Sequence, residues 1–329
     1  MTCKYSMILL KNIFTFLFSN LLFSNNAFAA FECLADYEPA KIMQVGPKLF
    51  SILPPYASFD PCNKSVELNL IKNSSDLVVL MHGGGGLSES QAKLAKALNN
   101  EGISTLFFDS FKMNKIHMDS RWWALNNTTG PKQRMLYHAN IAAVKWLGKN
   151  FDTAHFNVHL YGVSSGATAA LNISSNEDLN NLKTVMVEGG AAMGIGLPDK
   201  IIRPTFFIFG LEDNYGGKTV DEFMWNRVVD CSWNIEILDT PVGNAIDCNR
   251  YVNKKNKTES LDNYINRQKN NGHPISIKFY KDAGHDIFSG KIRRFIINSP
   301  SGNLYATLGA NEDASNKVFI DIKSFINHK

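Results

Sequence analysis

The stretch HLYGVSSGATAA, His159 to Ala170, decides how the rest of the chain is interpreted. An apolar run ends at Gly162, a serine pair follows, and small residues continue beyond the pair. The pattern Gly162-Val163-Ser164-Ser165-Gly166 is G-x-S-x-G, which is typical of a sharp strand-to-helix turn that projects its serine outward. So short a pattern also occurs by chance. Its interpretation therefore depends on whether the chain supplies a base, an acid and an oxyanion hole.

Strand-like and helix-like segments alternate on both sides of this stretch. This alternation predicts an α/β fold, with a mostly parallel sheet and helices on both of its faces. Parallel sheets bind their ligands at the carboxyl ends of the strands. We expect an irregular, proline-rich opening before residue 66, and we expect 275–280 to be the last clear strand. The predicted strands are 66–70, 77–81, 103–108, 155–161, 182–187, 205–209 and 275–280, and the predicted helices are 88–98, 135–147, 167–173 and 317–326.

One region breaks the alternation. Residues 214–272 are polar and loop-rich, and they lack the apolar periodicity that a core of their own would need. We interpret them as an insertion into a single domain of residues 30–329, with a small second domain as the alternative. Trp225 in the insertion and Trp122 elsewhere, together with Gly83, are candidates for the lining of a substrate pocket.

Three side chains form a candidate catalytic set. A serine hydroxyl needs a base to take its proton and an acid to orient that base. Ser164 follows the strand at 155–161, Asp213 follows the strand at 205–209, and His285 follows the strand at 275–280. The order Ser, Asp, His is the one expected for a serine on such a turn. Glu212, next to Asp213, and Asp239, inside the insertion, remain alternatives for the acid.

The run MHGGGGL, Met81 to Leu87, is the candidate oxyanion loop, because it follows one buried strand and precedes a helix. We expect the backbone N–H groups of Gly84 and Ser165 to be the oxyanion donors, and His82 to be structural rather than catalytic. A phosphate-binding loop is the alternative, but no Lys-Ser or Lys-Thr pair follows the glycines.

Five segments in chain order carry a resemblance to a known family. MHGGGGL, FFDSF, YGVSSGA, RPTFFIFGLED and FYKDAGHDI look like the successive motifs of dienelactone hydrolase-type α/β-hydrolases, from Val66 to the C-terminal helix. The resemblance implies the α/β-hydrolase fold, hydrolysis of a carboxylic ester or lactone, and Ser164, Asp213 and His285 as the triad. Dienelactone hydrolases proper carry a cysteine nucleophile, so the likeness is to their serine-bearing esterase relatives. The insertion between the acid and the histidine is unusually long for the family.

The first 29 residues predict an export signal. Lys4 and Lys11 flank an apolar segment that ends in small residues, and we expect cleavage after Ala29. A membrane anchor is disfavoured, because Lys11 and Asn12 interrupt the apolar run. We therefore expect a periplasmic or secreted protein with no stable membrane anchor after cleavage.

Four cysteines remain after signal cleavage, an even number that suggests two disulfides in an exported chain. We favour Cys33–Cys62 and Cys231–Cys248. A zinc site is disfavoured, because no C-x-x-C or paired-histidine spacing occurs.

Charge adds little to the choice of function. The formal net charge is +4, of which Lys4 and Lys11 contribute two, so +2 remains after cleavage. The basic residues of the chain are scattered, and they give no reason to expect nucleic acid as a partner. We expect a small-molecule ester as substrate and no metal or cofactor. A serine peptidase and a non-catalytic binding protein on a hydrolase scaffold are the alternative functions.

Overall fold

The computed structural model describes residues 41–46, 49–53, 59–114, 131–151, 156–190, 197–214, 261–299 and 302–327. The chain divides into two units, Met1–Asp36 and Tyr37–Lys329, and all the described residues belong to the second. The predicted signal peptide, residues 1–29, lies outside the described residues and remains a prediction.

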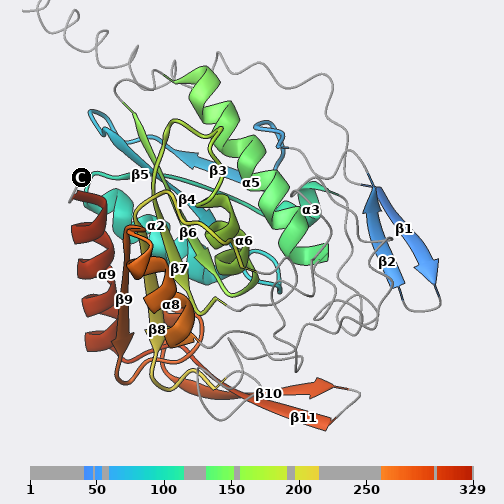
Figure 1. Ribbon diagram of the computed structural model, residues 1–329, viewed down its shortest axis with the longest axis vertical. Coiled ribbons are helices and arrows are strands. Elements are labelled where there is room, and N and C mark those ends of the chain that lie inside the picture. The colour runs from blue at the N-terminus through green and yellow to red at the C-terminus, as the bar shows by residue number, and fades with distance from the viewer. Residues whose placement is uncertain are drawn as a thin grey trace, which may run out of the picture. The chain divides into compact units, whose positions relative to one another are not determined.

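A seven-stranded sheet forms the centre of this unit (Figure 1). Only β3 runs antiparallel to its neighbour, β5, and the other neighbouring strands are parallel, which confirms the prediction of a mostly parallel sheet. The strand order across the sheet is β3 (Val66–Asn69), β5 (Ser104–Phe108), β4 (Asp76–Met81), β6 (Asn157–Val163), β7 (Leu182–Glu188), β8 (Thr205–Gly210) and β9 (Ile275–Tyr280).

The strand order reverses between β4 and β6. From β4 the chain moves outward to β5 and then returns past β4 to β6. In open α/β sheets, ligands bind in the crevice outside the carboxyl ends of the strands at such a reversal. Here the two strands end at Met81 and Val163, directly before the glycine loop and Ser164. The topology therefore brings the two motifs to one edge of the sheet.

Helices cover both faces of the sheet, as predicted. On one face, Leu94 and Leu98 of α2 (Glu89–Asn100) and Val318 and Ile322 of α9 (Glu312–Asn327) share a buried apolar cluster with strand side chains such as Leu80. On the other face, α6 (Ser165–Ile173) packs on β6 and β7, and α5 (Pro131–Asn150) packs on α6 (Figure 1). Burial of these apolar faces is the main force that holds the layers together.

The start of α2 follows from its sequence. Ser88 caps the helix with its side chain, and the Gln91 side chain accepts the Ser88 backbone N–H at 3.0 Å, so that the two form a capping box. This arrangement satisfies N–H groups that a helix leaves unpaired at its first turn. It also fixes where the glycine loop, which directly precedes Ser88, has to end.

The structure contains elements that the sequence analysis did not predict. The expectations of an irregular opening before residue 66 and of a last strand at 275–280 are both wrong. One antiparallel hairpin, β1–β2, precedes residue 66, and a second, β10–β11, follows residue 280. Prolines mark the ends of segments, and they did not exclude strands between them. The additional elements are β1 (Lys41–Gly46), β2 (Leu49–Leu53), α3 (Ser110–Met113), α8 (Leu261–Asn270), the short 3₁₀-helix η3 (Ile287–Ser289), β10 (Arg293–Ser299) and β11 (Gly302–Leu308).

Helix α8 belongs to the region that was interpreted as a loop-rich insertion. Its buried residues Leu261, Tyr264, Ile265 and Gln268 have helical spacing, and the Tyr264 hydroxyl donates to the Pro198 carbonyl at 2.9 Å. The end of the insertion is therefore part of the helical layer. Residues 215–260 lie outside the described residues, so the insertion itself remains a prediction.

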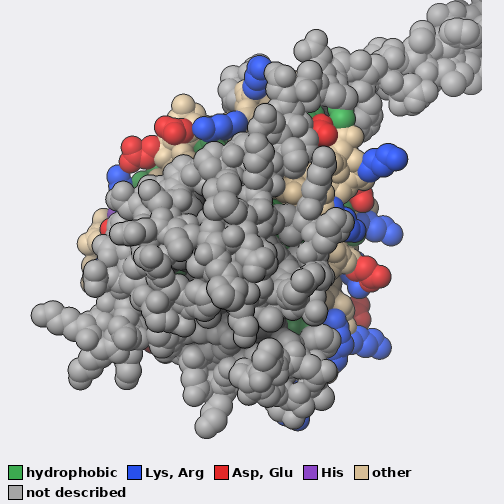
Figure 2. Space-filling view, turned by 90° about the vertical axis from the view of Figure 1, so that its right-hand side faces the viewer, with side chains coloured by type: hydrophobic (Ala, Val, Ile, Leu, Met, Phe, Trp, Pro, Cys, Tyr) green, Lys and Arg blue, Asp and Glu red, His purple; other side chains and the backbone are tan. Residues whose placement is uncertain are grey.

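The described surface carries charges of both signs. On the face in Figure 2, the described basic and acidic side chains are interspersed, with small hydrophobic areas between them. Among the helices of the described segments, none is long and apolar enough to cross a membrane.

Candidate active site

Ser164 lies at the sharp turn between β6, which ends at Val163, and α6, which begins at Ser165. Its φ of 56° and ψ of −119° are rare for a residue with a side chain, and such strain is concentrated at functional sites. The turn is held from the neighbouring strand, because the Ser164 N–H donates to the Glu188 carbonyl at 2.9 Å. Strand, strained serine and helix thus follow one another at the reversal of a mostly parallel sheet. The chain has an α/β-hydrolase fold.

Both glycines of the motif are required by close backbone contacts. A side chain on Gly162 would overlap the carbonyl oxygen of Gly166, and one on Gly166 would overlap the carbonyl oxygen of His82. The second contact joins the serine turn of the hydrolase fold to the glycine loop. The G-x-S-x-G pattern is therefore explained by packing in this turn.

The glycine loop lies against the serine. A Cβ built on Gly83 would be 3.3 Å from the Cβ of Ser164 and 3.9 Å from its Oγ. Gly84 follows in the same loop and is partly exposed. At the other side of the serine, the Ser165 N–H is the first of α6, and the first N–H groups of a helix have no acceptor within that helix. The structure therefore brings the two predicted oxyanion segments to the same serine.

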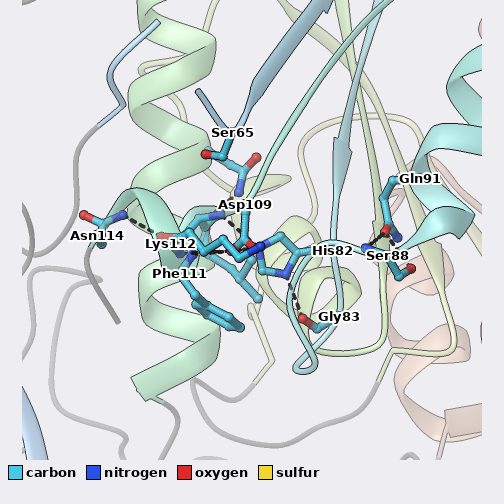
Figure 3. Close-up of polar contacts among 12 residues, drawn as sticks. Ser65, His82, Gly83, Ser88, Gln91, Asp109, Phe111, Lys112 and Asn114 are labelled. Carbon is cyan, nitrogen blue, oxygen red and sulfur yellow. Dashed lines mark hydrogen bonds and ion pairs between the residues drawn. The ribbon is translucent and has the colours of Figure 1, made fainter. Parts of the chain in front are cut away.

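The ring of His82 points toward Gly83 of this loop (Figure 3). Its ring is fully buried, and its Nε2 accepts the Ser110 N–H at 3.0 Å at the start of α3. The Nδ1 therefore carries the hydrogen, which it donates to the Gly83 carbonyl at 2.8 Å. Burial lowers the pKa of His82, although the Gly83 carbonyl and the charge of Asp109 oppose this shift. A neutral imidazole thus links the glycine loop to α3.

The structure brings Asp213 and His285 together. Asp213 follows β8 and is 1% exposed, His285 follows β9 and is 4% exposed, and the Nδ1 of His285 donates to the Asp213 Oδ2 at 2.9 Å. Because Nδ1 carries the hydrogen, the lone pair of the ring is on Nε2, where a general base needs it. Glu212 is exposed, and Asp239 lies outside the described residues. Of Glu212 and Asp213, only Asp213 is buried against the imidazole.

The electrostatic environment favours the charged form of His285. Burial alone would lower the pKa of His285, but the charge and hydrogen bond of Asp213, with the charges of Asp286 and Glu188, raise it above its usual value. An imidazole of raised pKa is a stronger base, and its cationic form is already stabilised when it receives a proton.

Ser164 and His285 are connected through one short backbone segment. The Glu188 carbonyl accepts the Ser164 N–H, and the next residue, Gly189, lies against the imidazole. A Cβ built on Gly189 would be 2.8 Å from the His285 Nδ1 and 3.2 Å from the Asp213 Oδ2. The end of β7 therefore supports the serine turn on one side and the histidine–aspartate pair on the other.

The β10–β11 hairpin, which the sequence does not predict, anchors the loops that carry His285 and Asp213. Its residue Thr307 accepts the backbone N–H of His285 at 2.7 Å, and its own N–H donates to the Asn214 side chain at 2.8 Å. The Gly309 N–H returns a bond to the His285 carbonyl at 2.9 Å. Both loops are thus fixed to the same strand.

Glu188 is the functional candidate that sequence reasoning missed. It is 1% exposed, its Oε1 accepts the Ile287 N–H at 2.7 Å, and its Oε2 accepts the hydroxyl of Tyr161. Burial and the nearby charge of Asp286 raise its pKa to about 7. The available signal was an acidic residue directly after the apolar run Val185-Met186-Val187, at the end of a strand that was already predicted as buried.

Several predicted site residues cannot be placed. Cys62 takes part in a disulfide, but both predicted pairings remain predictions. Among the residues that the structure describes, no three His, Cys, Asp or Glu side chains gather as metal ligands would. The predicted site residues outside the described residues are Trp122, Trp225, Cys33, Cys231 and Cys248.

Comparison with known proteins gives similarities at the level of structure. A scan against protein-family models finds no match, and a search of curated proteins finds none either. Similar solved structures include a dienelactone hydrolase from Anabaena variabilis, at 17% identity and a TM-score of 0.48 over 80% of this chain and 90% of that one. Est1E from Butyrivibrio proteoclasticus is 10% identical, with a TM-score of 0.42 over 88% and 98% of the two chains. The esterase domain of a Rhodothermus marinus protein is 12% identical, with a TM-score of 0.41 over 79% and 90%. The α/β-hydrolase assignment rests on the strand order and the serine turn described above.

Proposed function

We propose that this protein is a serine hydrolase that cleaves carboxylic esters or lactones. The observation that carries the proposal is the buried His285–Asp213 pair, at 2.9 Å, together with the Glu188–Gly189 segment, which contacts both this pair and the strained turn of Ser164. A base oriented by a carboxylate, next to a serine on such a turn, is the arrangement that acyl transfer needs.

The reaction then follows from the roles of the groups. His285 takes the proton of the Ser164 hydroxyl through Nε2 while the serine oxygen attacks the ester carbonyl carbon. The carbonyl oxygen becomes an oxyanion, and the N–H groups of Gly84 and Ser165 stabilise it. The imidazolium of His285 donates its proton to the departing alcohol oxygen, which leaves an acyl-serine. Water, deprotonated by the same imidazole, attacks the acyl-serine, and the imidazolium returns the proton to the Ser164 oxygen as the acid is released.

Asp213 acts throughout by holding the Nδ1–H tautomer and stabilising the imidazolium. It stays ionised in each step. In the proposed mechanism His285 carries each proton transfer, and the backbone N–H groups stabilise the oxyanion.

The test is hydrolysis of short-chain nitrophenyl esters by the wild type and by Ser164→Ala. We expect kcat of the variant to fall by at least about 10³-fold, because the nucleophile is lost. Ser175→Ala, in the turn after α6, is the matched control and should keep the wild-type rate. A fluorophosphonate should label the wild type and the control, but not Ser164→Ala. Equal turnover of Ser164→Ala and wild type would remove Ser164 from the mechanism.

The same preparations test the alternative functions. A peptidase would release product from peptide amides faster than from the ester panel. A binding protein without activity would neither turn over an ester nor react with the fluorophosphonate.

A further inference from the structure

Glu188 links the turn of Ser164 to the loop that carries His285. Its main-chain carbonyl holds the N–H of Ser164, and its side chain reaches the loop that carries His285. The carboxylate lies at the end of β7, where it accepts one bond from the Ile287 backbone and one from the Tyr161 hydroxyl of the adjacent strand β6. A buried carboxylate with two donors is held firmly, since leaving either donor unpaired would be unfavourable.

The loop that Glu188 holds has a conformation that requires support. Between His285 and Ile287, Asp286 adopts a left-handed backbone with φ 52° and ψ 68°. Such a conformation is uncommon for a residue other than glycine. The loop is fixed on one side by the Glu188–Ile287 bond and on the other by a hydrogen bond between the Asp286 side chain and Ser90 of α2. The direction of the imidazole therefore depends on Glu188 through two peptide units.

The charge of Glu188 also acts on the imidazole. The titratable groups that face it are Tyr161 from β6 and His285 and Asp286 from the loop after β9. Tyr280 of β9 lies within electrostatic range of Tyr161, and the charges of Lys93 in α2 and Arg293 in β10 act on Asp286. Within this group Glu188 favours the protonated form of His285 and so raises its pKa. Above its own pKa of about 7, Glu188 thus supplies a second negative charge to the histidine, besides Asp213.

We propose that Glu188 is a positioning residue for the hydrolysis, which holds the His285 loop through Ile287 and stabilises the imidazolium with its charge. This inference rests on the proposed function, because it assigns Glu188 a part in the Ser164 reaction. It goes beyond the triad, since Glu188 acts through His285 and exchanges no atom with the substrate.

Two substitutions separate the two effects of Glu188. Glu188→Gln removes the charge but keeps an amide oxygen that can accept the Ile287 N–H. We expect the acid limb of the kcat/KM profile to move to lower pH, because loss of a negative charge disfavours the imidazolium. Glu188→Leu also removes the bond to Ile287, and we expect its kcat to fall by about 10²-fold, since the base is then misplaced.

The matched control is Glu177→Gln, which removes the same charge from an exposed glutamate that pairs with Lys200. We expect its rate and pH profile to equal those of the wild type. Thermal unfolding of each variant shows whether it is folded. If Glu188→Leu does not fold, the comparison of Glu188→Gln with Glu177→Gln decides the question.

A second measurement is independent of turnover. The imidazole resonance of His285, assigned by its loss in His285→Gln, is titrated in the wild type and in Glu188→Gln. We expect the midpoint to fall in Glu188→Gln in parallel with the acid limb. If Ser164-dependent hydrolysis is present but neither the limb nor the midpoint moves, the positioning role is wrong and the proposed function stands. If no Ser164-dependent hydrolysis is found, the proposed function fails and the positioning role fails with it.

Discussion

Replacement of Gly189 by alanine tests whether the end of β7 sets the direction of the imidazole. Gly189 has a φ of +56°, and its missing Cβ would lie 2.8 Å from the His285 Nδ1 and 3.0 Å from the Cε1. To regain an ordinary contact of 3.4 Å, the ring would have to move by about 0.6 Å. Protein interiors have little free space, so such a movement would displace the groups packed around the ring. The same Cβ would be 3.2 Å from the Asp213 Oδ2, so the alanine methyl group could not avoid the ring by moving toward that carboxylate.

The expected effects of Gly189→Ala are a modest loss of stability and a large loss of rate. The left-handed backbone should lower the free energy of unfolding by about 1–2 kcal/mol. A displaced base should lower kcat by about 10²-fold, since misplacement of a reacting group by an ångström can have that effect. Gly102→Ala is the matched control, because Gly102 has a φ of +81° and a Cβ there would meet nothing within 4 Å.

The assay combines chemical unfolding with the Ser164-dependent hydrolysis of a short nitrophenyl ester. Gly102→Ala should share the loss of stability and keep the wild-type kcat. The reasoning is refuted if Gly189→Ala also keeps the wild-type kcat, because the contact with His285 would then have no bearing on the reaction.

Two further substitutions test other parts of the site. Asp213→Asn should lower kcat by about 10³–10⁴-fold through loss of the correct tautomer. It should also shift the acid limb of kcat/KM to lower pH, because Asp213 raises the pKa of His285. Glu212→Gln, at an exposed residue, should have neither effect, and equal losses for the two variants in pH–rate measurements would contradict the assignment of Asp213. His82→Leu should lower the free energy of unfolding by about 1–3 kcal/mol, because it leaves the buried Ser110 N–H without its acceptor. It should also slow ester hydrolysis without changing the acid limb of kcat/KM. Denaturant titration measures the first effect and pH–rate profiles the second, and an unchanged rate would show that His82 does not support the candidate oxyanion loop.

The sheet could be predicted from the sequence because its signals are local. Continuous apolar runs such as 77–81 and 205–209 are typical of strands that are buried on both faces, and Ser88 marks the start of a helix. The candidate triad followed from the same information, since each of its residues comes shortly after a predicted strand. Parallel strands bring their carboxyl ends together, so the sequence positions implied proximity.

Of the missed features, only the burial of Glu188 depends on partners that are distant in the chain, whereas the hairpin and helix α8 have local signals. A glutamate at the end of a strand is usually exposed, and only the donors from Tyr161 and Ile287 explain why Glu188 is buried. The β10–β11 hairpin pairs two runs around Pro300, Ser301 and Gly302, a turn signal that was not used. Helix α8 has three apolar residues, Leu261, Tyr264 and Ile265, among its ten, and the polar composition around it concealed them.

The bonds that Thr307 makes have a consequence for the order of events during synthesis. The serine, the aspartate and the histidine are all translated before β11, yet the loops of the last two are fastened to that strand. A nascent chain that ends at residue 300 would contain Ser164, Asp213 and His285. It would lack β11, the strand to which the loops of Asp213 and His285 are bonded. We therefore expect the proposed activity to appear only after β11 has been synthesised and has paired with β10.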